Sequence, residues 1–260
     1  MSEFNEKSYK GSIALSLLKV KKTQIQMLID RKIVDISLLP THILDETYGI
    51  GDFLEEFQGG GGFRENISNT YKKLNGDNLL IIYSNTSKKS KTTGNSTIKL
   101  IIDRVPEITD GSRNHLIVIS ELKLSPQAKG IIKNIQYQMK MEHFIYSELE
   151  TNPSSHFLTP KHEILTDSEV IELYSDHRIQ ISNIPRIVKD DMMCRYIGAC
   201  IGKTLKITYD NSFYDSYLKE YIEYRAVVSS VNIDDGEITT DYQEKFEDEF
   251  SISEYYDEEF

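Results

Sequence analysis

Acidic residues are concentrated at the C-terminus of this chain, and this segregation limits where a folded core can form. The 260 residues carry 41 Asp and Glu against 30 Lys and Arg, a formal net charge of −11. The segment Val231–Phe260 holds twelve acidic side chains and one basic side chain, Lys245, so it accounts for the whole excess. Such charge density opposes folding of an isolated segment. We expect residues 1–230 to fold and residues 231–260 to form a disordered acidic tail.

The composition of the chain excludes several protein classes. A hydrophobic fraction of 39% is too high for a wholly disordered chain or a collagen-like fibre. No stretch approaches the roughly 20 apolar residues of a membrane-spanning helix, and Met1–Lys10 lacks the apolar core of a secretory signal. Cys194 and Cys200 match no metal or redox spacing. We expect a soluble, intracellular protein with reduced thiols, no cofactor, no metal and no membrane partner.

Apolar spacing in the first half predicts an α/β domain over residues 1–152. Ser12–Lys32 has helical spacing, with Lys19, Lys21 and Lys22 near its middle. We interpret these lysines as a solvated face, with contact to nucleic acid as the alternative. The glycine run Gly59–Gly62 predicts a mobile loop.

Strands and a further helix should complete this domain. Three short runs rich in β-favouring residues predict buried strands: Leu79–Tyr83, Ile98–Ile102 and Leu116–Ser120. Ser125 can cap the following helix, and Pro126 suits its first position. The apolar stripe extends the predicted helix to about Glu148. The sequence Asn152-Pro153 should break it, and we place the domain boundary there.

The second half predicts a small α+β domain over residues 153–230. Phe157–Leu165 should be extended, and Thr166 with Glu169 forms the capping box of a short helix that ends near His177. Alternation of apolar and polar residues then predicts a strand over Thr204–Tyr209 that pairs with Tyr221–Val228.

Short motifs occur in a fixed order in this second half. They are Pro160-Lys161-His162, Ile184-Pro185-Arg186-Ile187, Arg195-Tyr196, Gly198, Gly202 and Tyr224-Arg225. In their order and spacing, they resemble the C-terminal assembly module of the fifth subunit shared by eukaryotic nuclear RNA polymerases, a module that also occurs alone as a small subunit of archaeal RNA polymerase. The first half resembles the jaw module of that family through Leu17–Thr23 and Leu124–Lys129.

The chain also departs from this family. Met192 stands where the family usually has proline, Ile201 replaces a basic residue, and Asp210–Glu223 replaces a short turn. The glycine run and the acidic tail have no counterpart that we can name. This divergence and the Ile-, Asn- and Lys-rich composition are compatible with a polymerase encoded by a large DNA virus.

The resemblance implies a non-catalytic subunit of a multisubunit DNA-directed RNA polymerase that acts in transcription. The C-terminal assembly domain would dock on the largest polymerase subunit, and the α/β jaw-like domain would lie beside downstream DNA. The protein would then act in the nucleus, or in the virion or cytoplasmic viral factory if a virus encodes it.

Two sets of residues are the candidates for these contacts. The candidate partner-binding residues are Pro160, His162, Pro185, Arg186, Arg195, Tyr196, Gly198, Gly202, Lys203 and Arg225. The candidate DNA-proximal residues, expected to make weak phosphate contacts, are Lys88, Lys89, Lys91, Ser125, Pro126 and Lys129. The guanidinium groups of Arg186 and Arg195 suit partner carboxylates or carbonyls, and internal salt bridges are an equally open alternative.

An enzymatic alternative rests on the residues around the predicted strand Leu116–Ser120. Glu121 and Lys123 follow this strand, and Asp103 ends the strand predicted before it. Residues i and i+2 share one face of a strand, so this arrangement could hold a divalent ion and activate water. It resembles the site of restriction-endonuclease-type nucleases. Charged residues after a buried strand more often mark its exit into solvent.

Overall fold

The computed structural model describes residues 2–58, 63–84, 98, 114–135, 139–177, 183–210 and 220–229. The chain divides into two compact units, Met1–His156 and Phe157–Phe260. The predicted glycine-run loop and the predicted acidic tail lie outside the described residues. Within the described part, no helix has the length and apolar character required to cross a bilayer.

The N-terminal unit begins with a long helix, α1 (Ser2–Arg31), which includes the helix predicted over Ser12–Lys32. Short helices then lead to the first strand: η1 (Ile36–Leu38), η2 (Thr41–Leu44), α2 (Ile50–Glu56) and α3 (Phe63–Asn66). The remaining elements are β1 (Asn69–Lys72), β2 (Asn78–Tyr83), β3 (Asn114–Ser120), α5 (Pro126–Ile135), β4 (Lys140–Ile145), α6 (Tyr146–Leu149) and η3 (Pro153–Ser155).

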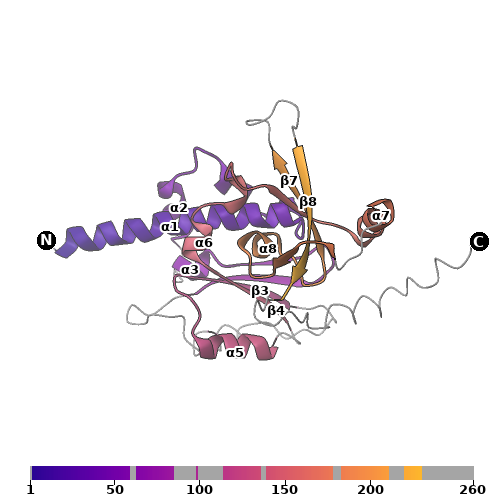
Figure 1. Cartoon of the computed structure of the whole chain (residues 1–260). Helices are drawn as coiled ribbons and strands as arrows, with labels where there is room; N and C mark the ends of the chain where they lie inside the picture. The colour runs from indigo at the N-terminus through magenta and orange to yellow at the C-terminus, as the bar shows by residue number, and fades with distance from the viewer. Residues whose placement is uncertain are drawn as a thin grey trace, which may run out of the picture. The chain divides into compact units, whose positions relative to one another are not determined.

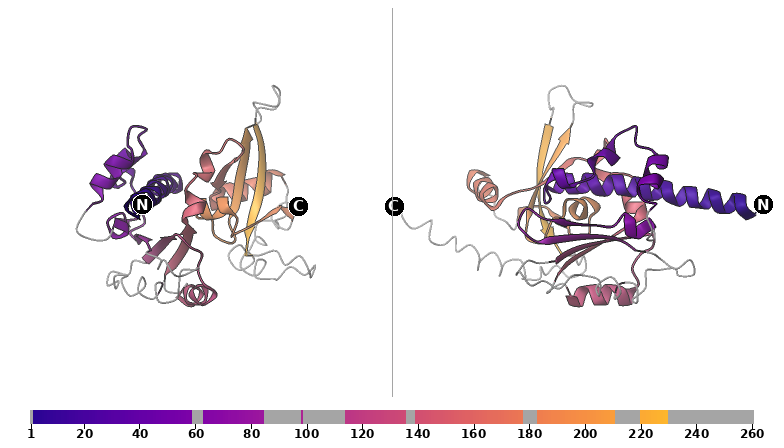
Figure 2. Two further views of the ribbon diagram at one scale, coloured as in Figure 1. Left: turned by 90° about the vertical axis from the view of Figure 1, so that its left-hand side faces the viewer. Right: turned by 180° about the vertical axis from the view of Figure 1, so that it is seen from behind.

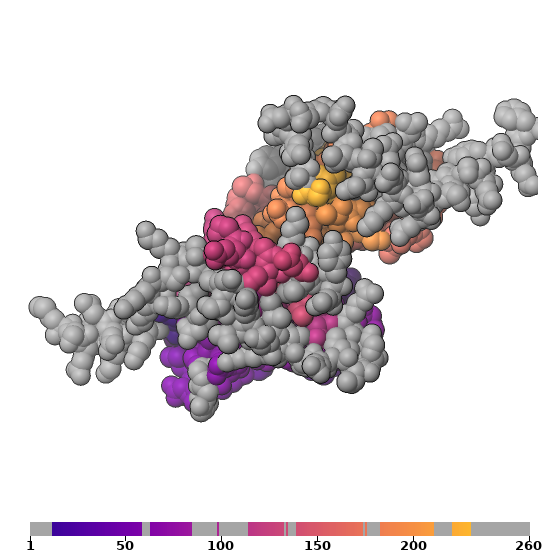
Figure 3. Space-filling view, turned by 90° about the horizontal axis from the view of Figure 1, so that it is seen from below, coloured from indigo at the N-terminus to yellow at the C-terminus, as the bar shows by residue number. Residues whose placement is uncertain are grey.

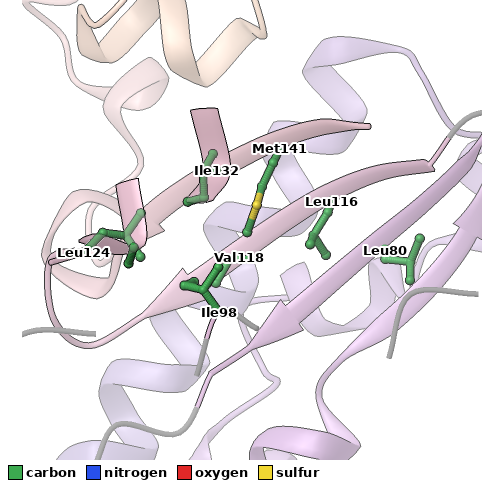
Figure 4. Close-up of a cluster of buried hydrophobic side chains, with 8 residues drawn as sticks. Leu80, Ile98, Leu116, Val118, Leu124, Ile132 and Met141 are labelled. Carbon is green, nitrogen blue, oxygen red and sulfur yellow. The ribbon is translucent and has the colours of Figure 1, made fainter. Parts of the chain in front are cut away.

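The sheet of this unit has the strand order β1-β2-β3-β4 and lies between α1 and α5 (Figures 1 and 2). The β1–β2 pair is antiparallel, whereas β2–β3 and β3–β4 are parallel. Both faces of the central strands are buried, which explains why β2 and β3 form continuous apolar runs. Figure 4 shows the core between the sheet and α5, formed by Leu80, Ile98, Leu116, Val118, Leu124, Ile132 and Met141.

Two of the three strands predicted for this unit are confirmed. The strands around Leu79–Tyr83 and Leu116–Ser120 are present as β2 and β3. Of the strand predicted over Ile98–Ile102, the structure describes Ile98 alone, which is helical and fully buried, so the prediction is wrong at that residue; its other residues lie outside the described part. Sequence periodicity alone could not distinguish a short buried strand from a buried piece of helix.

The helix predicted from Pro126 to about Glu148 is shorter than expected. Ser125 caps it as predicted, since the backbone N–H of Ala128 donates to Ser125 Oγ at 3.2 Å. However, α5 ends at Ile135, and the chain continues as β4. Pairing with β3 provides β4 with backbone hydrogen bonds, and this tertiary contact outweighs the local helical pattern.

The C-terminal unit is a four-stranded mixed sheet with the order β5-β7-β8-β6. Its strands are β5 (Lys161–Ile164), β6 (Arg186–Val188), β7 (Thr204–Asp210) and β8 (Glu220–Val228). The predicted β7–β8 pair is confirmed and antiparallel, and its ribbon is prominent in Figure 1. The helices are α7 (Asp167–His177) and α8 (Met192–Ile197).

Two small cores stabilise this sheet. Val170 and Leu173 of α7 pack with Leu165 and Tyr224, whereas Cys194 of α8 belongs to the other core, with Leu205, Ile207 and Val227. The predicted capping box of α7 is present, because the backbone N–H of Thr166 donates to Glu169 Oε2 at 2.7 Å and that of Glu169 donates to Thr166 Oγ1 at 3.3 Å. The sequence did not lead us to predict α8 or the short edge strand β6.

Candidate functional site

A shallow groove lies along β8 in the C-terminal unit. It has a volume of about 200 Å³ and is lined by Leu173, Asn183, Ile184, Pro185, Tyr221, Ile222, Glu223 and Tyr224. Tyr221 is 54% exposed and Ile222 is 40% exposed, although both are large hydrophobic residues. An apolar groove with exposed aromatic and aliphatic walls is suited to a protein partner. Sequence reasoning included Pro185 but missed Tyr221 and Ile222, because alternation in a strand does not show which face remains uncovered.

Pro185 and Arg186 enter β6 beside this groove. Both side chains are exposed, and the Pro185 carbonyl accepts a hydrogen bond from the backbone N–H of Ala226 at 2.9 Å. This bond fixes the start of β6 against β8. It leaves the Arg186 guanidinium at the surface of the unit, where its planar donors can reach carboxylates or carbonyls of another chain.

A short polar network on β7 and β8 contains Arg225. Arg225 Nε donates to Glu223 Oε1 at 2.8 Å, and Tyr209 Oη donates to Glu223 Oε2 at 3.1 Å. The hydrogen bond from Arg225 lowers the pKa of Glu223, although partial burial opposes the shift. Arg225 therefore pairs with Glu223 of its own strand.

His162 of β5 also makes a local contact: its Nδ1 donates to the Pro160 carbonyl at 2.8 Å.

The two predicted glycines both adopt positive φ angles. Gly198 has φ of 74° and ends α8, where its N–H donates to the Arg195 carbonyl and the N–H of Ala199 donates to the Cys194 carbonyl. This pair of bonds closes the helix in the manner favoured by glycine. Gly202 has φ of 89° and forms the turn before β7. Both glycines thus shape the backbone.

Other predicted partner-binding residues have roles within the unit. Tyr196 is completely buried, so its side chain is part of the core. Arg195 is half-buried and interacts within the chain. Lys203 Nζ lies 2.6 Å from Asp167 Oδ1 in an exposed ion pair. The structure therefore brings Pro185 to the groove, with the exposed Arg186 next to it in the chain, and does not place all the predicted residues on one surface.

The candidate DNA-proximal residues of the N-terminal unit lie at the start of α5. Pro126 and Lys129 are exposed, whereas Ser125 is half-buried and its hydroxyl caps the helix. Figure 3 shows the region around α5 at the surface of the unit. Lys88, Lys89 and Lys91 lie outside the described residues.

Among the described residues, Glu121 and Lys123 do not have the geometry that the nuclease alternative requires. The strand β3 ends at Ser120, so Glu121 and Lys123 do not project together from one strand face. Glu121 Oε2 instead lies 3.4 Å from Arg64 Nη2 in an ion pair. Asp103 is not among the described residues, and those described contain no cluster of three or more His, Cys, Asp or Glu suited to a metal ion. Nothing in the part of the chain that the structure describes supports metal-dependent cleavage.

The N-terminal unit contains a buried ionic network that sequence reasoning missed. Arg31 donates to both carboxylate oxygens of Glu142, at 3.2 and 2.7 Å, and His115 Nε2 lies 2.8 Å from Glu142 Oε1. Burial would raise the pKa of Glu142, but Arg31, His115 and Lys140 together hold it well below its ordinary value. Burial lowers the pKa of His115. These groups come from the end of α1 and from two strands, so no local motif could reveal them.

Similarity to known proteins covers the same C-terminal unit most strongly. Residues 151–227 match the protein family described as RNA polymerase Rpb5, C-terminal domain. This range begins shortly before the unit and ends within β8. The groove, the turn glycines and the polar network all lie inside the matched range.

The chain is also similar in sequence to RNA polymerase subunits from an amoeba, a nematode and a plant. The chain is 28% identical over 195 residues to the Dictyostelium discoideum protein "DNA-directed RNA polymerases I, II, and III subunit rpabc1", covering 74% of this chain and 88% of that protein. It is 31% identical over 135 residues to the Caenorhabditis elegans protein "DNA-directed RNA polymerases I, II, and III subunit RPABC1", covering 52% and 61%. It is 31% identical over 112 residues to the Arabidopsis thaliana protein "DNA-directed RNA polymerases IV and V subunit 5B", covering 43% and 49%.

The chain thus spans most of the amoeba relative and about half to three fifths of the other two. The family match and these relatives thus make the chain similar to subunits of DNA-directed RNA polymerases.

Proposed function

We propose that this chain is a non-catalytic, structural subunit of a multisubunit DNA-directed RNA polymerase and that its C-terminal unit docks on the largest subunit. One observation carries the proposal: the range that matches the polymerase family, residues 151–227, contains the groove along β8. A scaffold subunit needs such a surface for a partner. Bond formation in transcription would then take place on the other subunits.

The docking surface that we propose combines apolar and charged contacts. Tyr221 and Ile222 provide large exposed hydrophobic side chains, and Pro185 provides a rigid wall. Exposed Arg186 lies next to Pro185 at the start of β6 and can pair with carboxylates or carbonyls of the partner. Aromatic side chains and arginine commonly carry much of the binding energy in protein interfaces.

The N-terminal unit would lie near downstream DNA and contact it weakly. Exposed Lys129 of α5 is the described residue best suited to a phosphate contact among our candidates. Such a contact would position the duplex without reading its sequence, and its contribution would fall as the salt concentration rises. We propose the nucleus as the site of action, or the viral factory and virion if a virus encodes the chain.

Purification of a tagged chain from its natural source tests the docking proposal. Mass spectrometry should identify the largest polymerase subunit and its companions in the purified complex. Arg186→Glu or Ile222→Asp should reduce their recovery at least several-fold, whereas the control Lys72→Glu, an exposed change in the N-terminal unit, should not. Recovery of the wild-type chain without polymerase subunits would refute the proposal, and equal recovery with all three variants would refute this surface.

The DNA proposal requires a separate measurement on the assembled polymerase. Lys129→Glu should leave subunit recovery unchanged and lower the affinity for downstream duplex DNA at low salt. Gln127→Ala, an exposed neutral change in the same helix, is the control. Equal DNA affinity of the Lys129→Glu complex and the wild-type complex over a salt series would remove Lys129 from the contact.

A further inference from the structure

The three lysines in the middle of α1 lie in very different environments. Lys19 is exposed and Lys22 is half-buried, whereas Lys21 is completely buried. Lys22 Nζ donates to the backbone carbonyls of Asp45 and Tyr48, each at 3.1 Å. The interpretation of all three as a solvated face is therefore wrong for Lys21. Both its neighbours on the helix, Val20 and Gln24, are also fully buried.

Lys21 reaches from α1 to the segment Ile67–Asn69, which follows α3 and includes the first residue of β1. Its Nζ donates to the Ile67 carbonyl at 2.9 Å, to Asn69 Oδ1 at 2.5 Å and to Gln24 Oε1 at 2.9 Å. An ammonium group has three N–H donors, and these three oxygens can accept all of them. Nζ also lies 5.5 Å from the centre of the Tyr83 ring.

The three acceptors are neutral, and among the residues that the structure describes no carboxylate contacts the buried ammonium group directly. Burial lowers the pKa of Lys21 to about 7, and the more distant Glu56 of α2 opposes this shift. Tyr83 of β2 faces the ammonium group, and Tyr71 of β1 and Tyr146 of α6 lie near Tyr83. Burial raises the pKa values of all three tyrosines, so they remain neutral near pH 7.

We propose that Lys21 is a proton-coupled latch that holds the segment Ile67–Asn69 against α1. In the closed state, the amine spans the two elements inside the core. In the open state, Ile67 and Asn69 separate from α1 and Lys21 is solvated. The segment leads into β1, the edge strand of the sheet, so opening would loosen that edge. This role goes beyond docking on a polymerase and does not depend on it.

The direction of the pH effect follows from the two states. The solvated amine has its ordinary pKa of 10.5, whereas the caged amine titrates near 7. Between these values the open state binds more protons than the closed state, so opening takes up a proton. The closed state therefore becomes more favourable as the pH rises from about 7 toward 10.5. Below about pH 7 both states carry the proton, and the dependence disappears.

Hydrogen exchange of the full-length chain from pH 6 to 9.5 tests the latch. The backbone N–H groups of Ile67 and Ser68, which donate to the Phe63 and Glu65 carbonyls, report opening of the segment. After correction for intrinsic exchange, the opening constant should fall about tenfold per pH unit above pH 7 in the wild type. It should not vary with pH in Lys21→Met. The matched control Lys22→Met should keep the wild-type dependence.

A second variant keeps the test decisive if Lys21→Met fails to fold. Asn69→Ala retains the lysine and removes one acceptor of its ammonium group, so it should shift the onset of the pH dependence below that of the wild type. The absence of pH dependence in the wild type would overturn the latch, as would an unchanged dependence in folded Lys21→Met. If the pH dependence of Asn69→Ala began at the same pH as in the wild type, that result would also overturn the latch.

Discussion

Glu142 neutralises an arginine that is almost inaccessible to solvent, and replacing it by glutamine should strongly destabilise the N-terminal unit. The side chain of Arg31 is 2% exposed and that of Glu142 is 15% exposed. Removing one partner of a buried pair leaves the other charge uncompensated, at a cost of about 3–5 kcal/mol. The Glu142→Gln variant retains the shape of the side chain, so the loss reports charge and hydrogen bonding rather than a cavity.

Guanidinium denaturation at pH 7, followed by far-ultraviolet circular dichroism, measures the loss in unfolding free energy. Hydrogen exchange of β3 and β4 assigns it to the N-terminal unit. The control Glu223→Gln disrupts the more exposed pair with Arg225 and should cost at most about 1 kcal/mol. The double variant Arg31→Met with Glu142→Leu should recover much of the stability, because it leaves no buried charge. Equal, small losses for Glu142→Gln and Glu223→Gln would refute this reasoning.

The same network predicts how the free energy of unfolding decreases as the pH becomes acidic. Because the pKa of Glu142 lies well below its ordinary value of 4.5 in the folded state, its contribution is present above pH 4.5 and is lost as the pH falls through the folded-state pKa. The pKa of His115 is also lowered from 6.5, so the unfolded state takes up a proton first and stability begins to fall below about pH 6.5. Glu142→Gln should flatten the steeper part below pH 4.5.

Three further changes test backbone and capping roles by thermal or chemical denaturation. Gly198→Ala should lower the free energy of unfolding by about 1–2 kcal/mol, because the residue has φ of 74°. Gly130→Ala is the matched control in α5: no atom lies within 4 Å of the added carbon, so it should raise the free energy of unfolding by about 0.5–1 kcal/mol. Equal effects of the two changes would contradict this account. Asp191→Ala should lower the free energy of unfolding by about 1 kcal/mol, because the Asp191 carboxylate accepts from the backbone N–H groups of Met193 and Cys194 at 2.8 and 3.3 Å. An unchanged denaturation midpoint would show that this cap contributes nothing. Ser125→Ala should shorten or fray α5 at a similar cost, which the loss of amide protection at Ala128 would reveal.

Local signals in the sequence predicted the elements that depend on local chemistry. The capping box at Thr166 and Glu169 specifies the start of α7, because both hydrogen bonds form within four residues. The cap at Ser125 is specified in the same way. Alternation identified β7, since Leu205 and Ile207 on one face of this strand contribute to a core, and β8 was predicted as its partner. The ordered motifs after Phe157 also indicated the polymerase family, which the match over residues 151–227 supports.

The candidate site was only partly accessible to sequence reasoning. Pro185 and Arg186 were identified from their motif, and the structure places them beside the groove. Tyr221 and Ile222 are as apolar as the buried Ala226 and Val227 of the same strand, so their exposure could not be read from the sequence. Tyr196 was included with the partner-binding residues through its motif, although its side chain is buried.

The sequence by itself determined the caps at Ser125 and Thr166, the turn glycines and the strands β2 and β3, because these depend on residues a few positions apart. Only the tertiary structure decided that β4 replaces the end of a predicted helix and that Lys21 points into the core while Lys19 faces solvent. The physical reason is that burial depends on what packs against a residue. Ile67 and Asn69, which accept from Lys21, and Glu142, which pairs with Arg31, lie more than forty positions away along the chain, where no local pattern can report them.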